Sequence, residues 1–103
     1  MKCVTLVRFT PKEKRPSVEY KKFLDGIMHV YAGAEGLRHK YFTVSDSGEA
    51  IGIYEWTSRA LAEGFFNDDW DRMMQGMATR HALEYLTVRA ELDNDAGGFE
   101  FYG

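Results

Sequence analysis

The chain has 103 residues and a net charge of −3, and 45% of its residues are hydrophobic and 15% aromatic. This length favours one domain, and the apolar content excludes a disordered chain. Charges of both signs are interleaved without a basic stripe, so a nucleic-acid partner has little support. One cysteine, Cys3, excludes an internal disulfide, and no run approaches the ~20 apolar residues of a membrane span. We therefore expect a cytoplasmic protein without membrane contact.

The first half of the chain predicts three strands and one helix. Residues 3–9 are rich in β-formers and end at a loop containing proline and lysine, which indicates a strand. Ser17 is the expected N-cap of a helix whose apolar residues recur at helical spacing as far as Tyr31. Residues 37–45 and 50–57 predict two strands joined by a tight Asp-Ser-Gly turn.

The second half predicts two helical pieces and a last strand. Thr57 or Ser58 is expected to cap the first piece, and Asn67 and Asp68 interrupt it and can cap the next, over residues 67–81. Residues 83–92 predict the last strand. The order βαββαβ indicates an α+β, ferredoxin-like fold over residues 1–95, with a four-stranded antiparallel sheet and helices on one face. Residues 96–103 form a tail of glycine and aromatic residues.

The predicted strands are apolar on both faces. In residues 50–57, Ile51 and Ile53 alternate with Tyr54 and Trp56. A half-exposed sheet would alternate apolar with charged residues, so we expect helices on one face and a second copy of the chain on the other. The chain would then be a homodimer, and the tail, residues 96–103, would be able to cross to the partner.

One stretch, residues 67–81, places five apolar or titratable residues at helical spacing, so that they share one face: Trp70, Met73, Met74, Met77 and His81. Such a stripe is usually core. Methionine also adapts to irregular shapes and is common on permissive binding surfaces. We therefore expect this face both to pack against the sheet and to line a pocket.

The block GLRHKYFTVSDSGEAIGIYEWTSRALAEGFFNDDW, residues 36–70, resembles the antibiotic-biosynthesis-monooxygenase superfamily of dimeric α/β barrels, and within it the YdhR-type monooxygenase-like proteins. The shared features are a Gly-Leu pair entering a strand, a hairpin into a Gly-hydrophobic-Tyr-x-Trp strand, a helix ending in Phe-Phe and a tryptophan opening the next helix. The resemblance extends over residues 3–95.

The resemblance implies a ligand pocket between the sheet and the helices of each subunit. It also implies a cofactor-independent monooxygenase acting on an aromatic or polyketide-like small molecule, in which the deprotonated substrate itself reduces O2 without metal or flavin. The protein would supply an apolar slot, a base or hydrogen-bond partner and exclusion of water. The alternatives are a cyclase or isomerase of the same fold, a non-catalytic small-molecule-binding dimer and, as a minor alternative, a haem-binding or haem-degrading protein.

His81 and His39 are the candidate catalytic bases, because an imidazole with an ordinary pKa of about 6.5 suits proton transfer at neutral pH. His81 has the alternative role of a C-terminal helix histidine. His39 lies in phase with Leu37 and Tyr41, and it faces either the pocket or the partner sheet, since the sequence does not fix the phase.

The candidate substrate-binding residues share an aromatic ring or a thioether, and their ordinary alternative is core packing. They are Tyr41, Tyr54, Trp56, Phe66, Trp70, Met73, Met74, Met77 and Tyr85. The sequence carries no two-histidine metal spacing on a helix and no glycine-rich phosphate loop, so no metal and no cofactor are expected.

Overall fold

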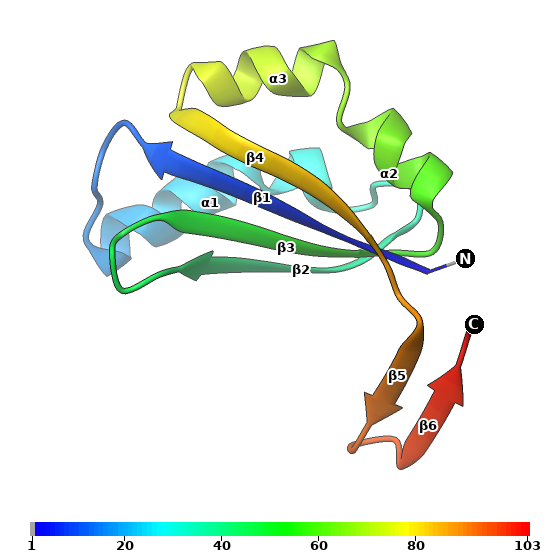
Figure 1. Ribbon diagram of the computed structural model, residues 1–103. Coiled ribbons are helices and arrows are strands. Elements are labelled where there is room, and N and C mark those ends of the chain that lie inside the picture. The colour runs from blue at the N-terminus through cyan, green and yellow to red at the C-terminus, as the bar shows by residue number, and fades with distance from the viewer. Residues whose placement is uncertain (1) are drawn as a thin grey trace.

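The computed structural model describes residues 2–103, and Figure 1 shows the arrangement of its elements. In chain order these are β1 (Cys3–Pro11), α1 (Ser17–Tyr31), β2 (Leu37–Val44), β3 (Ala50–Trp56), α2 (Arg59–Phe65), α3 (Asp68–Gln75), β4 (Ala78–Thr87), β5 (Ala90–Asp93) and β6 (Gly98–Phe101). One sheet has the strand order β2-β3-β1-β4, and each neighbouring pair is antiparallel. The predicted α+β, ferredoxin-like fold is confirmed.

The helices pack on the sheet face that carries Cys3, Thr5 and Val7 of β1 and Tyr54 and Trp56 of β3, all of which are buried. These residues share a face because side chains alternate along a strand, and Cys3 pairs with Trp56 and Thr5 with Tyr54 in the register. The Trp56 Nε1 donates a hydrogen bond of 3.0 Å to Thr5 Oγ1 inside this core. The core therefore forms between the sheet and the helices.

The opposite face of the sheet, which we call the outer face, carries Val4 and Leu6 of β1 and Ile51 and Ile53 of β3. All four are half-buried in the single chain. In the described range the helices pack on the other face, so none of them shields these side chains. The predicted apolar character of both faces is confirmed.

The break between α2 and α3 follows from two capping residues. Ser58 Oγ accepts a hydrogen bond of 3.2 Å from the backbone N–H of Leu61, and Asn67 Oδ1 accepts one of 3.0 Å from that of Trp70. Both caps were predicted, and each satisfies an N–H that a helix start leaves free. The prediction for Ser17 is wrong, because Pro16 occupies the N-cap of α1 and Ser17 is its first helical residue.

The predicted helix over residues 67–81 is too long. α3 ends at Gln75 with Gly76 as its C-cap, and β4 begins at Ala78. Glycine weakens a helix, and the backbone beyond it pairs instead with the end of β1, where Ala78 lies opposite Pro11. Met77 and His81 therefore leave the helix, and the five-residue helical face is reduced to Trp70, Met73 and Met74.

The predicted last strand over residues 83–92 is two strands. β4 pairs with β1 only as far as Thr87, which lies opposite Cys3 where β1 starts. The chain then leaves the sheet, and β5 and β6 form a separate two-stranded hairpin that projects from one end of the molecule (Figure 1). The predicted tail, residues 96–103, thus contains a strand.

No helix in the described part of the chain combines the length and the apolar content that crossing a membrane requires.

Candidate functional site

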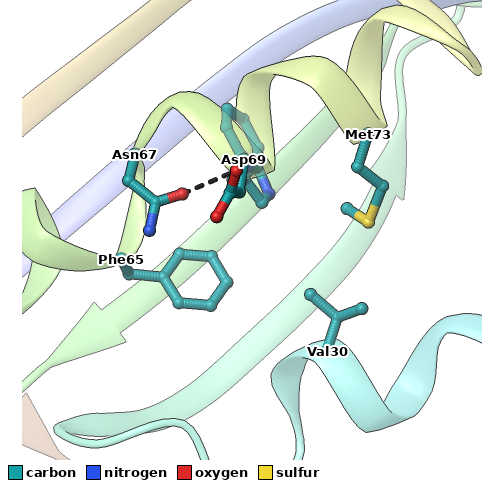
Figure 2. Close-up of a pocket in the computed structure, with 6 residues that line it drawn as sticks. Val30, Phe65, Asn67, Asp69 and Met73 are labelled. Atoms are coloured by element: carbon teal, nitrogen blue, oxygen red, sulfur yellow. Dashed lines mark hydrogen bonds between the residues drawn. The ribbon is translucent and has the colours of Figure 1, made fainter.

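A cavity of ≈ 270 Å³ lies between α1 and α3. Figure 2 shows Val30 of α1 and Met73 of α3 extending toward each other, with the ring of Phe65 beside them. The remaining lining residues are Asn67, Asp69 and Trp70. The wall is mainly apolar, and its polar groups gather at the start of α3, as in many small-molecule sites.

Trp70 lines this cavity and, within residues 2–103, carries a hydrogen-bond donor without a partner. Its side chain is buried, with 4% of its surface exposed, and its Nε1 has no hydrogen-bond partner among the described residues. The Phe66 ring packs edge-on against it with 4.8 Å between centroids and fixes the indole in place. A buried indole N–H nearly always has a partner, so this donor is suited to an oxygen acceptor on a bound molecule.

Behind the cavity lies a cluster of stacked and edge-to-face rings. Tyr54 and Trp56 stack with 6.0 Å between centroids, and Phe66 meets Tyr54 edge-on at 5.1 Å. Phe65 joins this cluster to the cavity, because it lies 5.3 Å from Trp56 and also lines the cavity wall. Burial, and then the neighbouring Tyr31, raise the pKa of Tyr54, so its phenol stays neutral and is no base.

The expected substrate-binding residues divide into three groups. Trp70 and Met73 line the cavity, and their contact with a substrate stays a prediction. The others on the helix side of the sheet belong to the core or pack against it, so ligand contact stays a prediction for them: Tyr54, Trp56, Phe66, Met74, Met77 and Tyr85. Tyr41 lies opposite Ile53 on the outer face and is 62% exposed, so its expected place in the pocket is wrong.

The two candidate histidines lie away from the cavity. His39 pairs with Glu55 in the register and is exposed on the outer face. His81 is an exposed residue of β4, at the bulge opposite Arg8 and Phe9, and its Nε2 lies 2.7 Å from Thr10 Oγ1. Its expected place at a helix end beside the pocket is wrong, because the helix stops before it. A catalytic role for either histidine stays a prediction.

Lys40 is the residue that sequence reasoning missed. The sequence predicted no role for it, yet it extends to the helix side of the sheet, where its Nζ lies 4.2 Å from the Tyr31 ring centroid and 4.8 Å from that of Tyr54. Burial lowers the pKa of Lys40 to about 7. The available signal was its spacing from Phe42, since residues two apart on a strand share a face.

Comparison with known proteins finds no family model and no curated protein that matches the sequence. Among solved structures, the fold is similar to SnoaB, a cofactor-independent oxygenase from Streptomyces nogalater. Two structures of SnoaB, one of them a mutant, align with TM-scores of 0.63 and 0.62 at 13% identity, over 85% of this chain and 93% of that one. Rv0793 from Mycobacterium tuberculosis aligns with a TM-score of 0.60 at 20% identity, over 90% of this chain and 97% of that one. At these identities the comparison shows the fold, which agrees with the ferredoxin-like fold that the sequence predicts.

Proposed function

We propose that the chain is a cofactor-independent monooxygenase-like enzyme that acts on an aromatic or polyketide-like small molecule in the cavity between α1 and α3. The observation that carries this proposal is the unpaired, buried Nε1 of Trp70, a residue of the mainly apolar cavity wall. The similarity of the fold to a cofactor-independent oxygenase supports it.

In this proposal a flat hydroxyaromatic lies against Phe65 and Met73, with its oxygen toward Trp70. The indole N–H stabilises the negative charge that develops on that oxygen when an acidic C–H or O–H proton passes to a water molecule, and this proton returns in the water that the reaction releases. The deprotonated ring transfers electrons to O2, one oxygen atom enters the product as a quinone carbonyl, and the other leaves as water. The apolar wall keeps bulk water from the anion.

The test is O2 uptake and quinone absorbance with a hydroxylated anthrone, which carries an acidic methylene, in buffer with a chelator. The rate without protein is subtracted. We expect turnover that falls about 10–100-fold in Trp70→Phe, which keeps the ring and removes a hydrogen bond to a developing charge worth roughly 1.5–3 kcal/mol. Turnover that Trp70→Phe leaves unchanged would contradict the proposed role of the indole.

The histidine variants His39→Ala and His81→Ala belong in the same assay. Both side chains lie on the outer face or at the sheet edge, so turnover that both variants keep would exclude these histidines as the base. Loss of turnover in either would restore that histidine as the base. Tight binding of the anthrone without O2 uptake would favour the alternative of a non-catalytic binding protein, and rearranged product without O2 uptake would favour a cyclase or isomerase.

We further propose that the chain acts as a homodimer joined through the outer face and the β5–β6 hairpin. The hairpin pairs Ala90 with Phe101 and Leu92 with Phe99, which places these apolar side chains on one face. Leu92, Phe99 and Phe101 are each about two-thirds exposed. A lone two-stranded hairpin is at best marginally stable in water, so this apolar face needs a cover.

The polar face of the hairpin already makes hydrogen bonds to other parts of the chain. Glu91 accepts hydrogen bonds from Lys2 Nζ at 2.6 Å and from the Tyr102 hydroxyl at 2.9 Å. The apolar face therefore points away from these anchors and is free to contact the partner subunit, in agreement with a tail that crosses to it.

A further inference from the structure

Lys40 sits in a cage of aromatic rings contributed by three elements. Its Nζ lies 3.2 Å from the ring centroid of Phe42 on β2, 4.2 Å from that of Tyr31 on α1 and 4.8 Å from that of Tyr54 on β3. The rings also contact one another, with 5.9 Å between Tyr31 and Phe42 and 6.1 Å between Tyr31 and Tyr54. We call these three rings the Lys40 cage.

The cage contains no counter-charge for the lysine. Among residues 2–103, no carboxylate oxygen lies within 4.0 Å of Lys40 Nζ, although ten other ion pairs have that geometry. The titratable groups that face it are the phenols of Tyr31 and Tyr54, and the raised pKa of Tyr54 keeps that phenol neutral. An unpaired buried ammonium is costly, and burial lowers the pKa of Lys40 to about 7.

Lys40 is nevertheless not fully enclosed, since it is half-buried. Phe65 connects the cage to the cavity, because its ring lies 5.8 Å from Tyr31 and 6.4 Å from Tyr54 and also forms part of the cavity wall. Lys40 itself is not part of the cavity wall, so an apolar molecule against Phe65 must pass the cage rings to bring a small polar group to Nζ.

We propose that Lys40 is a nucleophilic amine that captures apolar or aromatic aldehydes and ketones as imines. The Nζ lone pair adds to the carbonyl carbon, a proton passes from nitrogen to oxygen, and the carbinolamine loses water to leave a C=N bond. No oxidant, reductant or co-reactant is required. The imine nitrogen needs no charge, so the product avoids the cost of an unpaired buried ammonium, and its apolar substituent packs against the aromatic rings of the cage. This activity is separate from the proposed oxygenase chemistry and requires no O2.

Lysine reactivity at neutral pH distinguishes Lys40 from the exposed lysines. At pH 7 an amine with a pKa of about 7 is about half neutral, whereas an ordinary lysine with a pKa of about 10.4 is neutral in roughly one molecule in 2,500. Lower intrinsic nucleophilicity and partial shielding reduce this advantage. We expect a labelling rate at Lys40 that is still ten times that of exposed lysines or more.

The test treats the whole folded chain at pH 7 with benzaldehyde and cyanoborohydride, which fixes each imine as a stable benzylamine, and maps the label by peptide mass spectrometry. Lys40 should be labelled tenfold or more faster than Lys22, an exposed lysine of α1, with a rate that rises through pH 7. The advantage should vanish in guanidinium chloride, where the cage is lost. Peptide mapping separates the N-terminal amine, which also reacts near neutral pH.

Two matched variants complete the design. Lys40→Arg keeps the positive charge but forms no imine, so the fast label should disappear, while Lys22→Arg should keep it. Circular dichroism checks that both variants fold. Even labelling of all lysines in the folded chain, or a Lys40 that stays unlabelled while Lys22 reacts, would overturn the proposal.

Discussion

Two buried tryptophans differ in what their indole N–H contacts. Trp56 donates to Thr5 Oγ1 at 3.0 Å, with both residues fully buried, whereas Trp70 faces the cavity without a partner. Thr5→Val keeps the shape of the side chain but leaves the Trp56 N–H without a hydrogen-bond acceptor. We expect it to lower the free energy of unfolding by about 1–3 kcal/mol in urea titrations.

The control for this prediction is Trp56→Phe alone and combined with Thr5→Val. If the hydrogen bond matters, the valine substitution should cost less in the phenylalanine background, where no donor is left unpaired. Equal costs in both backgrounds would show that packing alone explains the effect.

Lys40 should make stability depend on pH. Its pKa in the folded chain is lowered to about 7 from 10.5, so between these values the unfolded chain binds a proton that the folded chain does not. Stability therefore rises with pH across this window. In Lys40→Met the contribution of this lysine to the rise of unfolding free energy with pH should be absent. The variant should also be more stable than the original chain at pH 7. Urea titrations from pH 7 to 10 measure this, with Lys22→Met as the control that keeps the slope.

At the scale of elements, α3 depends on its first residues because it is short. It spans Asp68–Gln75, and Asn67 supplies the side-chain cap through the N–H of Trp70. Asn67→Ala should lower the free energy of unfolding by about 1 kcal/mol, whereas Asn67→Ser should be nearly neutral, since both Asn and Ser cap well. Because Trp70 sits one turn from the cap, we also expect Asn67→Ala to weaken anthrone binding. Equal stability of the two variants would exclude a capping role.

The elements also show what the sequence was able to predict. Helical spacing and capping residues correctly located α2 and the start of α3, since both depend on local contacts. The end of α3 depends on pairing between Ala78 and Pro11, which lie far apart in sequence. The register shift between Leu37 and His39 likewise puts those two residues on opposite faces of β2, although simple alternation places them together. The wrong positions predicted for His81 and Tyr41 follow from such long-range pairing, which also decides the face of His39 that the sequence left open.

At the scale of the whole molecule, the outer face and the hairpin together leave a large apolar surface without cover in one chain. Ile53 lies near the middle of that face, between Leu6 of β1 and Tyr41 of β2 in the register. If two copies meet there, Ile53→Asp buries a charge without a partner at the interface, which costs several kcal/mol. We expect the original chain to be a dimer by sedimentation equilibrium and Ile53→Asp to be a monomer.

A matched control separates this interface from general surface effects. Val18 is 71% exposed on α1, on the helix side of the sheet, so Val18→Asp should leave the dimer intact. Replacing Phe99 and Phe101 together by serine tests the hairpin, and we expect the dimer to weaken about 100-fold or more, because two exposed rings lose burial worth roughly 1.5–3 kcal/mol each. A monomeric original chain at micromolar concentration would contradict both parts of the prediction. If Ile53→Asp leaves the dimer unchanged, the dimer contact lies at the hairpin and not on the outer face of the sheet.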